Sequence, residues 1–507
     1  MEFLKRSFFL GAFALLTLSW VGCDSDDPAP DPDLTPFCED ADNQNTLQCA
    51  IEADEVRYDT SGTTITIEDL GGGVAPRVNS IAWSSDFTYV LDGFVFVNDG
   101  QTLTIDPGTT IQGSEGEAED ASALIVARGA TIMAEGEPDN PIVFTSVQDT
   151  GNLPAGTRGL WGGLIVLGNA GLNSTPGETA IEGLPTGESR GLYGVGSGYS
   201  RDDNDNSGVL RYISIRYGGT NIGANNEING LTLGGVGDGT TVEYVEVINN
   251  ADDGIEFFGG TVNTKYLVCA FVGDDCFDTD EGYRGLNQFW FAIQAPDGDR
   301  GAEIDGGTDP EEGTPLSQYV VSNATFIGGG IGSDSDKALE IRDYATPRYY
   351  NSIFTQFNSG IRVEDIRNST TDSRSLVENG TTVLANNYWY NIDGASDFAD
   401  VIGITEFDSD GDGEDDTPVD TAFRGILADY LADNDNTISP NNILVSVSRS
   451  PNGGLDPRPT MADATDFTYG PLGDMFFNEV NYAGAFSTSS TWLNGWTALD
   501  ELGYLAN

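Results

Sequence analysis

Short segments of alternating apolar and polar residues recur between residues 230 and 364 of the chain. Their first residues lie 22 to 37 positions apart and are Gly230, Gly254, Cys276, Gly301, Ala338 and Gly360. Alternation with a period of two is typical of a half-buried β-strand, and a repeat of about 20–50 residues is typical of stacked structural units. The pattern therefore predicts a solenoid in which each coil contributes one of these strands.

The two faces of the predicted strands differ in chemistry. The apolar face begins with Leu231, Ile255, Phe277, Ala302, Leu339 and Ile361. The opposite face carries Thr232, Glu256, Asp278, Glu303, Glu340 and Arg362, and two residues later Gly234, Phe258, Asp280, Asp305, Arg342 and Glu364. Stacked coils would bury the apolar set and place a ladder of carboxylates on the outer face.

The rest of the chain extends the solenoid. Short β-branched and aromatic runs separated by Gly, Asn and Asp start near residue 94, as the corners of stacked coils require. Residues 183–206 and 284–300 are interpreted as insertions between coils. A short amphipathic helix is predicted over residues 421–431, and the aromatic side chains of residues 441–507 are expected to close the open end of the solenoid.

The balance of charge limits the partners of the protein. The chain has 22 basic and 81 acidic residues, for a net charge of −59, and contains no histidine. Nucleic acid is excluded as a partner because so acidic a protein cannot neutralise phosphates. Catalytic triads with histidine and His-ligated zinc are excluded as well. Ca²⁺, Mg²⁺ or a basic protein surface fits better, and the acidity suits either a salty habitat or simple solubility.

The N-terminus predicts export. Lys5 and Arg6 precede an apolar run over residues 7–21, and Gly22-Cys23 follow, which is typical of a signal peptide over residues 1–22. A small residue before Cys23 resembles the lipobox of bacterial lipoproteins, so Cys23 is the expected lipidation site, although Trp20 departs from that pattern. An ordinary signal peptide cleaved near Gly22 is the alternative. The acidic, Pro-rich residues 23–50 are expected to form an extended tether.

Several stretches carry a family resemblance: "DGQTLTIDPGTTIQG", "ALIVARGATIMAEG", "GLWGGLIVLGNAG", "ADDGIEFFGG", "DDCFDTDEG" and "WLNGWTALDELG". The chain resembles a family of secreted right-handed parallel β-helix surface lipoproteins of Gram-negative bacteria. The resemblance implies an all-β fold and a lipid-anchored location at the outer membrane or cell surface, and it implies no settled activity. The expected organisation places the parallel β-helix in residues 51–400 and an acidic loop with a capping region in residues 401–507.

The acidic loop is a predicted calcium site. Asp408, Asp410, Asp412 and Asp416 follow the spacing D-x-D-x-D-G-x-x-D, which supplies oxygen ligands around a sharp turn. Val419 replaces the glutamate that would complete an EF-hand, so the loop resembles other calcium loops of bacterial extracellular modules. A structural Ca²⁺ is expected here, with a solvated acidic linker as the alternative.

The carboxylate ladder is the second candidate site. Parallel strands stack about 4.8 Å apart, and two unit charges at that distance repel by about 1 kcal/mol in water. Arg300, Arg342 and Arg362 relieve this repulsion only in the later coils. Three interpretations of the ladder are open. The first is a solvated face, the second is a site for a divalent cation or a calcium-bridged glycan, and the third is a catalytic site.

Each functional interpretation has its own residues. The cation site adds the carboxylates of two adjacent turns, which are Asp252, Asp253, Asp274 and Asp275. The catalytic site, on the pattern of polysaccharide lyases and hydrolases, would use Asp278, Asp280, Glu303, Asp305 and Arg284.

The cysteines favour two disulfides in an oxidising compartment. With Cys23 lipidated, sequence proximity pairs Cys38 with Cys49 and Cys269 with Cys276, although the second pair is also compatible with buried thiols.

Together these features predict a lipid-anchored, Ca²⁺-dependent binding module for a glycan or a partner protein. A polysaccharide lyase or hydrolase is the first alternative. An accessory lipoprotein of an outer-membrane uptake complex is the second.

Overall fold

The computed structural model describes most of the chain from residue 57 onward. The described residues are 57–61, 63–69, 80–185, 187–196, 198–223, 226–308, 310–365, 372–403, 421–460 and 475–506. The chain divides into two compact units, Met1–Gln44 and Asn45–Asn507, and every described residue belongs to the second.

Several predicted features lie outside the described residues. They are the signal peptide, the tether, the lipidation site Cys23, the pair Cys38 and Cys49, and the loop ligands Asp408, Asp410, Asp412 and Asp416. No helix among the described residues is long and apolar enough to cross a membrane.

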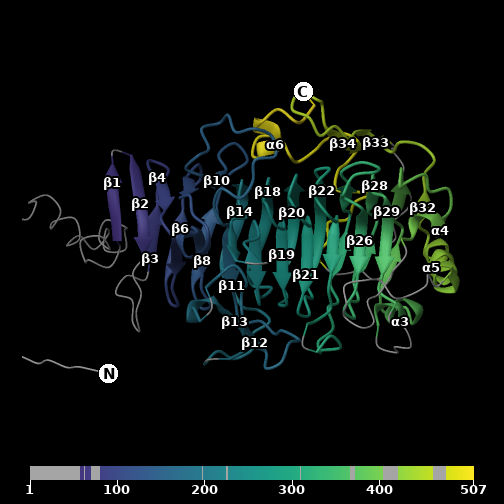
Figure 1. Cartoon of the computed structure of the whole chain (residues 1–507), viewed down its shortest axis with the longest axis horizontal. Coiled ribbons are helices and arrows are strands. Elements are labelled where there is room, and N and C mark those ends of the chain that lie inside the picture. The colour runs from purple at the N-terminus through teal and green to yellow at the C-terminus, as the bar shows by residue number, and fades with distance from the viewer. Residues whose placement is uncertain are drawn as a thin grey trace, which may run out of the picture. The chain divides into compact units, whose positions relative to one another are not determined.

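The second unit is a right-handed parallel β-helix, as predicted, and its coils build three stacks of parallel strands (Figure 1). The first stack contains β3 (Ser80–Trp83), β6 (Thr102–Ile105), β9 (Thr131–Glu135), the leading halves of β14 (Gly208–Arg216), β18 (Thr241–Ile248), β20 (Asn263–Ala270) and β22 (Leu286–Ile293), then β24 (Val320–Ser322), β27 (Arg348–Tyr350) and β30 (Val383–Ala385).

The second stack contains β2 (Thr64–Asp69), β4 (Thr88–Leu91), β7 (Thr110–Gly113), β10 (Ile142–Ser146), the trailing halves of β14, β18, β20 and β22, then β25 (Thr325–Ile327), β28 (Ile353–Thr355), β31 (Tyr388–Tyr390) and β32 (Thr437–Ile438). The third stack contains β5 (Phe94–Val97), β8 (Ala123–Val126), β11 (Leu164–Leu167), β17 (Leu231–Gly234), β19 (Ile255–Phe258), β21 (Phe277–Asp280), β23 (Ala302–Ile304), β26 (Lys337–Ile341) and β29 (Ser359–Val363). Strand β1 (Arg57–Ser61) pairs antiparallel with β2 at the start.

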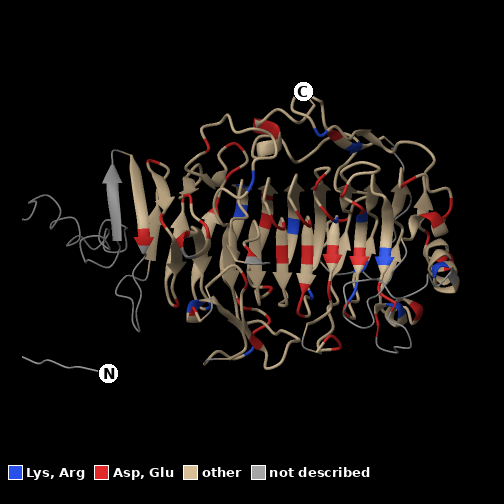
Figure 2. Ribbon diagram, in the orientation of Figure 1, with Lys and Arg blue, Asp and Glu red and all other residues tan. Residues whose placement is uncertain are grey.

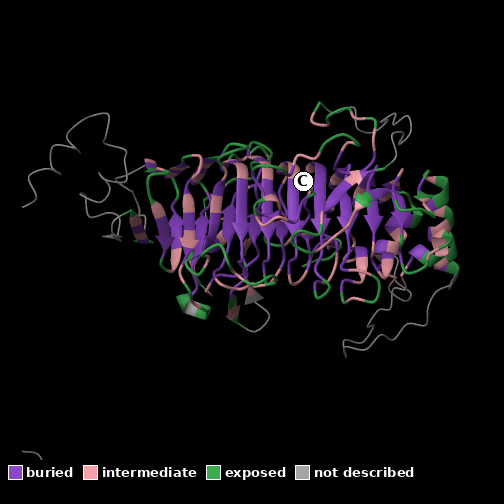
Figure 3. Cartoon of the chain, turned by 90° about the horizontal axis from the view of Figure 1, so that it is seen from above, coloured by how far each residue is buried: buried purple, intermediate pink, exposed green. Residues whose placement is uncertain are grey.

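The interior of the coils is apolar. The predicted inward-facing residues of the third stack, including Ile255, Phe277 and Ile361, are fully buried. Aromatic rings stack along the axis, with Trp290 lying 4.3 Å from Phe277 between ring centroids. Figure 3 shows buried residues along the strands and exposed residues mainly in the connections.

The corner between the first and second stacks is made by single residues in the left-handed conformation. Strands β14, β18, β20 and β22 bend there at Tyr212, Tyr244, Tyr266 and Phe289, whose φ angles lie between 48° and 62°. Asparagines occupy the same corner in the next three coils. A non-glycine residue in this conformation costs roughly 1–2 kcal/mol, and the stacking of neighbouring rings, 4.2–4.9 Å between centroids, offsets part of that cost.

The interpretation of residues 284–300 as an insertion is wrong. Strand β22 runs through this segment as a regular part of two stacks, and Trp290 lies fully buried in the core. The aromatic run Phe289-Trp290-Phe291 arises because the central residue points inward while Phe289 forms the corner.

The insertion around residues 183–206 does exist and begins earlier than predicted. The segment between β11 and β14 forms the antiparallel hairpin of β12 (Glu178–Ala180) and β13 (Leu192–Gly194), with the short 3-10 helix η2 (Ser189–Gly191). Its side chains Ile181, Leu184 and Tyr193 pack with Ile125 and Ile165 on the outer face of the third stack. The insertion therefore covers the early rungs of that stack and reaches the first acidic rung, where Glu182 and Glu256 both accept from Asn229.

The predicted helix over residues 421–431 forms α5 (Thr421–Asp433). Its Phe423, Leu427 and Leu431 join the solenoid core at the last coils, beside α4 (Phe398–Val401). Strand β32 follows α5 and pairs with β31, so the second stack continues beyond residue 400. Helix α3 (Ser373–Glu378) precedes β30.

The expectation that residues 441–507 close the open end is wrong. The described part of this segment contains β33 (Leu444–Ser446), β34 (Asp456–Pro459) and α6 (Ala498–Glu501), and it runs along the side of the solenoid (Figure 1). Trp492 and Trp496 pack edge-on against the rings of Tyr244 and Tyr266. The aromatic residues cover the outward-facing corner rings, while α5 covers the last coil.

The remaining elements are short. They are the 3-10 helix η1 (Ala118–Asp120) and the antiparallel pair β15 (Asn221–Gly223) and β16 (Asn226–Glu227).

Candidate metal centre

The carboxylate ladder stands in the predicted register on the third stack. Strand pairing places Thr232 beside Glu256, Glu256 beside Asp278, Asp278 beside Glu303, Glu303 beside Glu340, and Glu340 beside Arg362. Figure 2 shows acidic bands crossing these adjacent strands at one level, with a basic band on β29. The ladder is more buried than an outer face would suggest, since Glu256 and Glu340 are 5 % and 4 % exposed.

Arginines neutralise the later rungs. Arg300 Nη1 lies 3.0 Å from an Asp275 oxygen, and its Nε contacts Glu340. Arg342 lies 2.9 Å from Glu303 and 2.7 Å from Asp305. Burial acts to raise the pKa of Glu340, but Arg300, Lys337 and Arg362 outweigh it, so the net pKa is lowered. These rungs form a closed ionic network.

The expectation that Arg300 and Arg342 relieve the repulsion only in the later coils therefore needs a correction. Asp275, Glu303 and Asp305 are paired, because Arg300 and Arg342 reach back toward the preceding coils.

The earlier rungs hold carboxylates without such partners. Asp253, Glu256 and Asp278 offer oxygen atoms that all lie within 4.8 Å of one another. Burial raises the pKa of each well above its usual range, and neighbouring carboxylates raise it further. One buried oxygen of Asp278, Oδ1, has no hydrogen-bond partner among the described residues. We call Asp253, Glu256 and Asp278 the acidic triad.

Two further groups of three carboxylates border the triad. Asp252, Asp253 and Asp274 form one, and Asp274, Asp275 and Asp299 form the other. Burial, then the charges of Glu182 and Asp274, raise the pKa of Asp252 to about 7. The structure thus gathers all four predicted turn carboxylates around one place, although Asp275 is bound to Arg300.

Local structure explains how the turns hold these side chains. The Asp253 carboxylate accepts a hydrogen bond from the backbone N–H of Asp275 at 2.9 Å, which ties two consecutive turns together. Asn250 donates to the carbonyl of Asp253 at 2.8 Å. A Cβ at Gly254 would lie 2.6 Å from the sulfur of Cys269, so only glycine fits between the triad and the core.

A disulfide joins Cys269 and Cys276 beneath this turn. Both residues are fully buried, one at the end of β20 and one just before β21. The bond closes a short loop that carries Asp274 and Asp275, and it limits how far these carboxylates can move.

Sequence reasoning missed a second ladder one residue before each repeat. Backbone hydrogen bonds place Asn229, Asp253, Asp275, Arg300 and Lys337 at equivalent positions of successive coils. The buried Asn229 donates to Glu256 and, at 2.9 Å, to Glu182 of the insertion. Asn229 is 1 % exposed, and its Oδ1 has no partner among the described residues. The repeat alignment that predicts the first ladder also places these residues in one column, one position before each repeat.

The predicted catalytic set is not brought together as a whole. Asp278 and Glu303 are paired on adjacent strands, Asp305 directly follows β23, and Asp280 accepts a hydrogen bond from Thr308 at 2.7 Å. Arg284 instead donates to the carbonyls of Gly171 and Gly282 and pairs with Asp203. Two of these partners, Gly171 and Asp203, belong to the insertion, and Gly282 lies in the turn after β21.

The comparisons with known proteins agree with the fold. The model of a family described as the pectate-lyase-like β-helix domain matches residues 75–417, which include the acidic triad and the whole third stack. No curated protein and no solved structure matches the chain. Since the match covers well over half of its length, the chain belongs to the pectate-lyase-like β-helix domain family.

Proposed function

We propose that the β-helix is a Ca²⁺-dependent binding module whose acidic triad holds the cation and, through it, an acidic glycan. The observation that carries this proposal is that oxygen atoms of three carboxylates lie within 4.8 Å of one another, and none of the three forms an ion pair with an arginine in the described part of the chain. A hard divalent cation prefers such oxygen ligands, and Ca²⁺ takes six to eight of them. The triad supplies only some of these, so water or a ligand carboxylate completes the shell.

The orphaned oxygens support a cation at this place. Asp278 Oδ1 and Asn229 Oδ1 are both buried without a hydrogen-bond partner among the described residues, and each is an acceptor that a cation would satisfy. A bound cation would also remove the mutual repulsion of Asp253, Glu256 and Asp278. The donor set therefore fits Ca²⁺ in chemistry and supplies part of its ligand shell.

A Ca²⁺ titration of the protein by calorimetry tests the site. The background for all variants is Asp410→Asn/Asp412→Asn, which removes the predicted loop site from the isotherm. In that background Glu256→Gln is expected to weaken Ca²⁺ binding at least tenfold, because it removes one charged ligand. Glu115→Gln, at an exposed carboxylate, is the matched control. Equal isotherms for Glu256→Gln and Glu115→Gln would contradict the assignment.

Glycan binding requires its own measurement. A polygalacturonate column run with Ca²⁺ is expected to retain the protein, and a chelator or Glu256→Gln is expected to release it. Retention that persists in chelator would rule out cation bridging.

The family match favours a polysaccharide lyase as a second candidate function. A lyase would use Ca²⁺ at the same triad, with Arg342 as the exposed basic group nearest the ladder carboxylates Glu303 and Asp305. Incubation with acidic and neutral polysaccharides separates the candidates. Unsaturated products that disappear in Asp278→Asn would replace the binding proposal with the lyase.

We also propose that the module is exported and lipid-anchored through Cys23, with residues 23–50 as the tether. The pattern of a charged start, an apolar run and Gly22-Cys23 supports this proposal. A role as an accessory lipoprotein of an outer-membrane uptake complex fits the same anchor. Labelling with a radioactive fatty acid in a Gram-negative host is expected to mark the protein and to fail for Cys23→Ser.

A further inference from the structure

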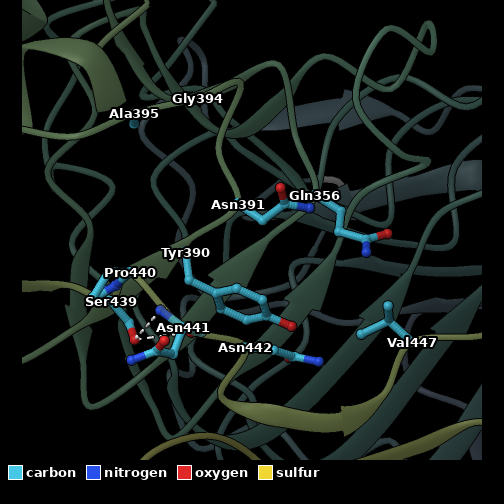
Figure 4. Close-up of a pocket in the computed structure, with 10 residues that line it drawn as sticks. All are labelled: Gln356, Tyr390, Asn391, Gly394, Ala395, Ser439, Pro440, Asn441, Asn442 and Val447. Atoms are coloured by element: carbon cyan, nitrogen blue, oxygen red, sulfur yellow. Dashed lines mark hydrogen bonds between the residues drawn. The ribbon is translucent and has the colours of Figure 1, made fainter.

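A separate pocket of about 390 Å³ lies near the last coils. It is lined by Gln356, Tyr390, Asn391, Gly394, Ala395, Ser439, Pro440, Asn441, Asn442 and Val447 (Figure 4). None of these residues belongs to the acidic triad or to the turns around it. The volume is near the lower end of the range for small-molecule sites, about 300–1,000 Å³.

The backbone of the solenoid presents two of the amide side chains. Gln356 follows β28 and Asn391 follows β31, so they occupy the same corner in successive coils. Both adopt the left-handed conformation, with φ of 64° and 49°, and the N–H of Gln356 donates to the carbonyl of Asn391 at 3.0 Å. The opposite wall comes from the segment after β32, where Ser439 Oγ donates to the carbonyl of Asn441 at 2.9 Å.

The lining is neutral in a very acidic protein. The chain carries 81 acidic residues, yet none of the ten lining residues is charged. Five of them have amide or hydroxyl side chains in addition to Tyr390: Gln356, Asn391, Ser439, Asn441 and Asn442. A cationic ligand would find no carboxylate among the lining residues. An anionic ligand would be repelled by the net charge of −59, and the nearby Arg449 is already engaged by Gln356.

Hydrogen bonds within the protein determine which atoms of the Gln356 amide remain for a ligand. Gln356 Oε1 accepts a hydrogen bond from Arg449 at 2.7 Å, which leaves the NH₂ group of Gln356 to donate. Arg449 also contacts the backbone carbonyls of Gln294 and Gly328, and this fixes the orientation of the amide. Figure 4 shows the Tyr390 ring between Asn391 on one side and Asn442 on the other, and Tyr390 is 5 % exposed.

We propose that this pocket binds a neutral saccharide unit. Sugar hydroxyls both donate and accept hydrogen bonds, as amide and hydroxyl side chains do, and the apolar faces of sugar rings pack on apolar side chains such as the half-buried Val447. Because the site holds no carboxylate, its binding is independent of Ca²⁺. It is therefore a second site, distinct in chemistry and in cation requirement from the triad.

The test uses neutral tetrasaccharides of glucose, mannose, galactose and xylose at millimolar concentration, with chelator present throughout. Saturation-transfer NMR detects binding, and calorimetry gives the dissociation constant. At least one neutral tetrasaccharide is expected to bind, and tetragalacturonate is not. Asn441→Ala and Asn391→Asp are each expected to weaken binding about fivefold, the loss of one neutral hydrogen bond.

Two control variants test whether a loss of binding is specific to the pocket. Asn452→Asp makes the same change at an exposed asparagine that also adopts a positive φ, 60°, outside the pocket, and it is expected to leave binding unchanged. Glu256→Gln is also expected to leave it unchanged, which separates this site from the triad. The proposal is overturned if no neutral tetrasaccharide binds, or if Asn441→Ala and Asn391→Asp bind as well as Asn452→Asp.

Discussion

At the scale of single residues, Glu281 shows how the insertion is coupled to pH. Glu281 is 7 % exposed and accepts a hydrogen bond from Tyr193 of the insertion at 2.6 Å. Burial raises its pKa from 4.5 to about 7, although the Tyr193 hydrogen bond lowers it somewhat. The folded protein therefore holds a proton here that the unfolded chain releases above pH 4.5.

This extra proton makes the stability of the folded protein depend on pH. Between about pH 4.5 and 7 the folded state binds the extra proton, so the free energy of unfolding falls as pH rises, by up to about 1.4 kcal/mol per pH unit. Glu281→Gln keeps a carbonyl acceptor for Tyr193 and removes the titration. Denaturant unfolding at pH 5 and pH 8 is expected to show a smaller loss of stability for Glu281→Gln than for wild type. If Glu281→Gln loses as much stability between pH 5 and pH 8 as the exposed-site control Glu115→Gln, the raised pKa of Glu281 is contradicted.

The residues of the two ladders could be predicted only where the alternation of apolar and polar positions identified them. The positions of Glu256, Asp278 and Glu303 followed from the two-residue period of their strands. Asn229 and Asp253 lie in the turns before the strands, where no period applies, and only the repeat alignment connects them. The pairing of Arg284 with Gly171 and Asp203 could not be predicted, because these residues belong to an insertion about 80–115 positions earlier in the chain.

At the scale of elements, the corner between the first and second stacks depends on which residues tolerate a positive φ. Tyr244 has φ of 55°, whereas the later coils use asparagine at this corner. Tyr244→Asn and Tyr244→Val both remove the stacked ring, but asparagine adopts the left-handed conformation far more readily than a β-branched residue. Tyr244→Val is expected to be less stable than Tyr244→Asn by about 1 kcal/mol or more in denaturant unfolding. Equal stabilities would show that the backbone angle is unimportant.

The C-terminal segment is fastened to the solenoid by a buried carboxylate. Glu246 of β18 is fully buried, and it accepts hydrogen bonds from the N–H of Ala498 at 2.6 Å and of Leu499 at 3.2 Å at the start of α6. Glu246→Ala would leave these donors without a partner and is expected to destabilise the protein by about 2–4 kcal/mol.

Limited proteolysis gives a second measurement of the same change. Glu246→Ala is expected to speed cleavage within residues 475–506, while Glu243→Ala, on the same strand at a half-exposed position, is the control. Equal cleavage rates in the two variants would contradict the role of Glu246 in docking this segment.

The elements themselves were predictable to different degrees. The third stack could be predicted because its alternating pattern recurs in each coil. Helix α5 could be predicted because its amphipathic pattern is complete within a short segment. The position of residues 475–506 depends on contacts with Tyr212, Tyr244 and Tyr266, more than 200 residues away in the sequence. The aromatic residues indicated burial but not which surface they would cover.

At the scale of the whole molecule, the net charge of −59 makes stability depend on salt. Self-repulsion weakens as the screening length shrinks from about 10 Å at 0.1 M to about 3 Å at 1 M salt. The melting temperature is expected to rise over this range of NaCl. A melting temperature that stays constant would rule out adaptation to a salty habitat and leave solubility as the reason for the charge.

The corner bends also determine where this fold can acquire new recognition. Because β14, β18, β20 and β22 turn at a single residue, the first and second stacks follow each other there without a connecting loop. Several long connections, such as those from β11 to β14 and from β23 to β24, leave or enter the third stack. Specificity can therefore diversify by exchange of loops around the carboxylate ladder, while the opposite corner stays constant as a scaffold for grafting.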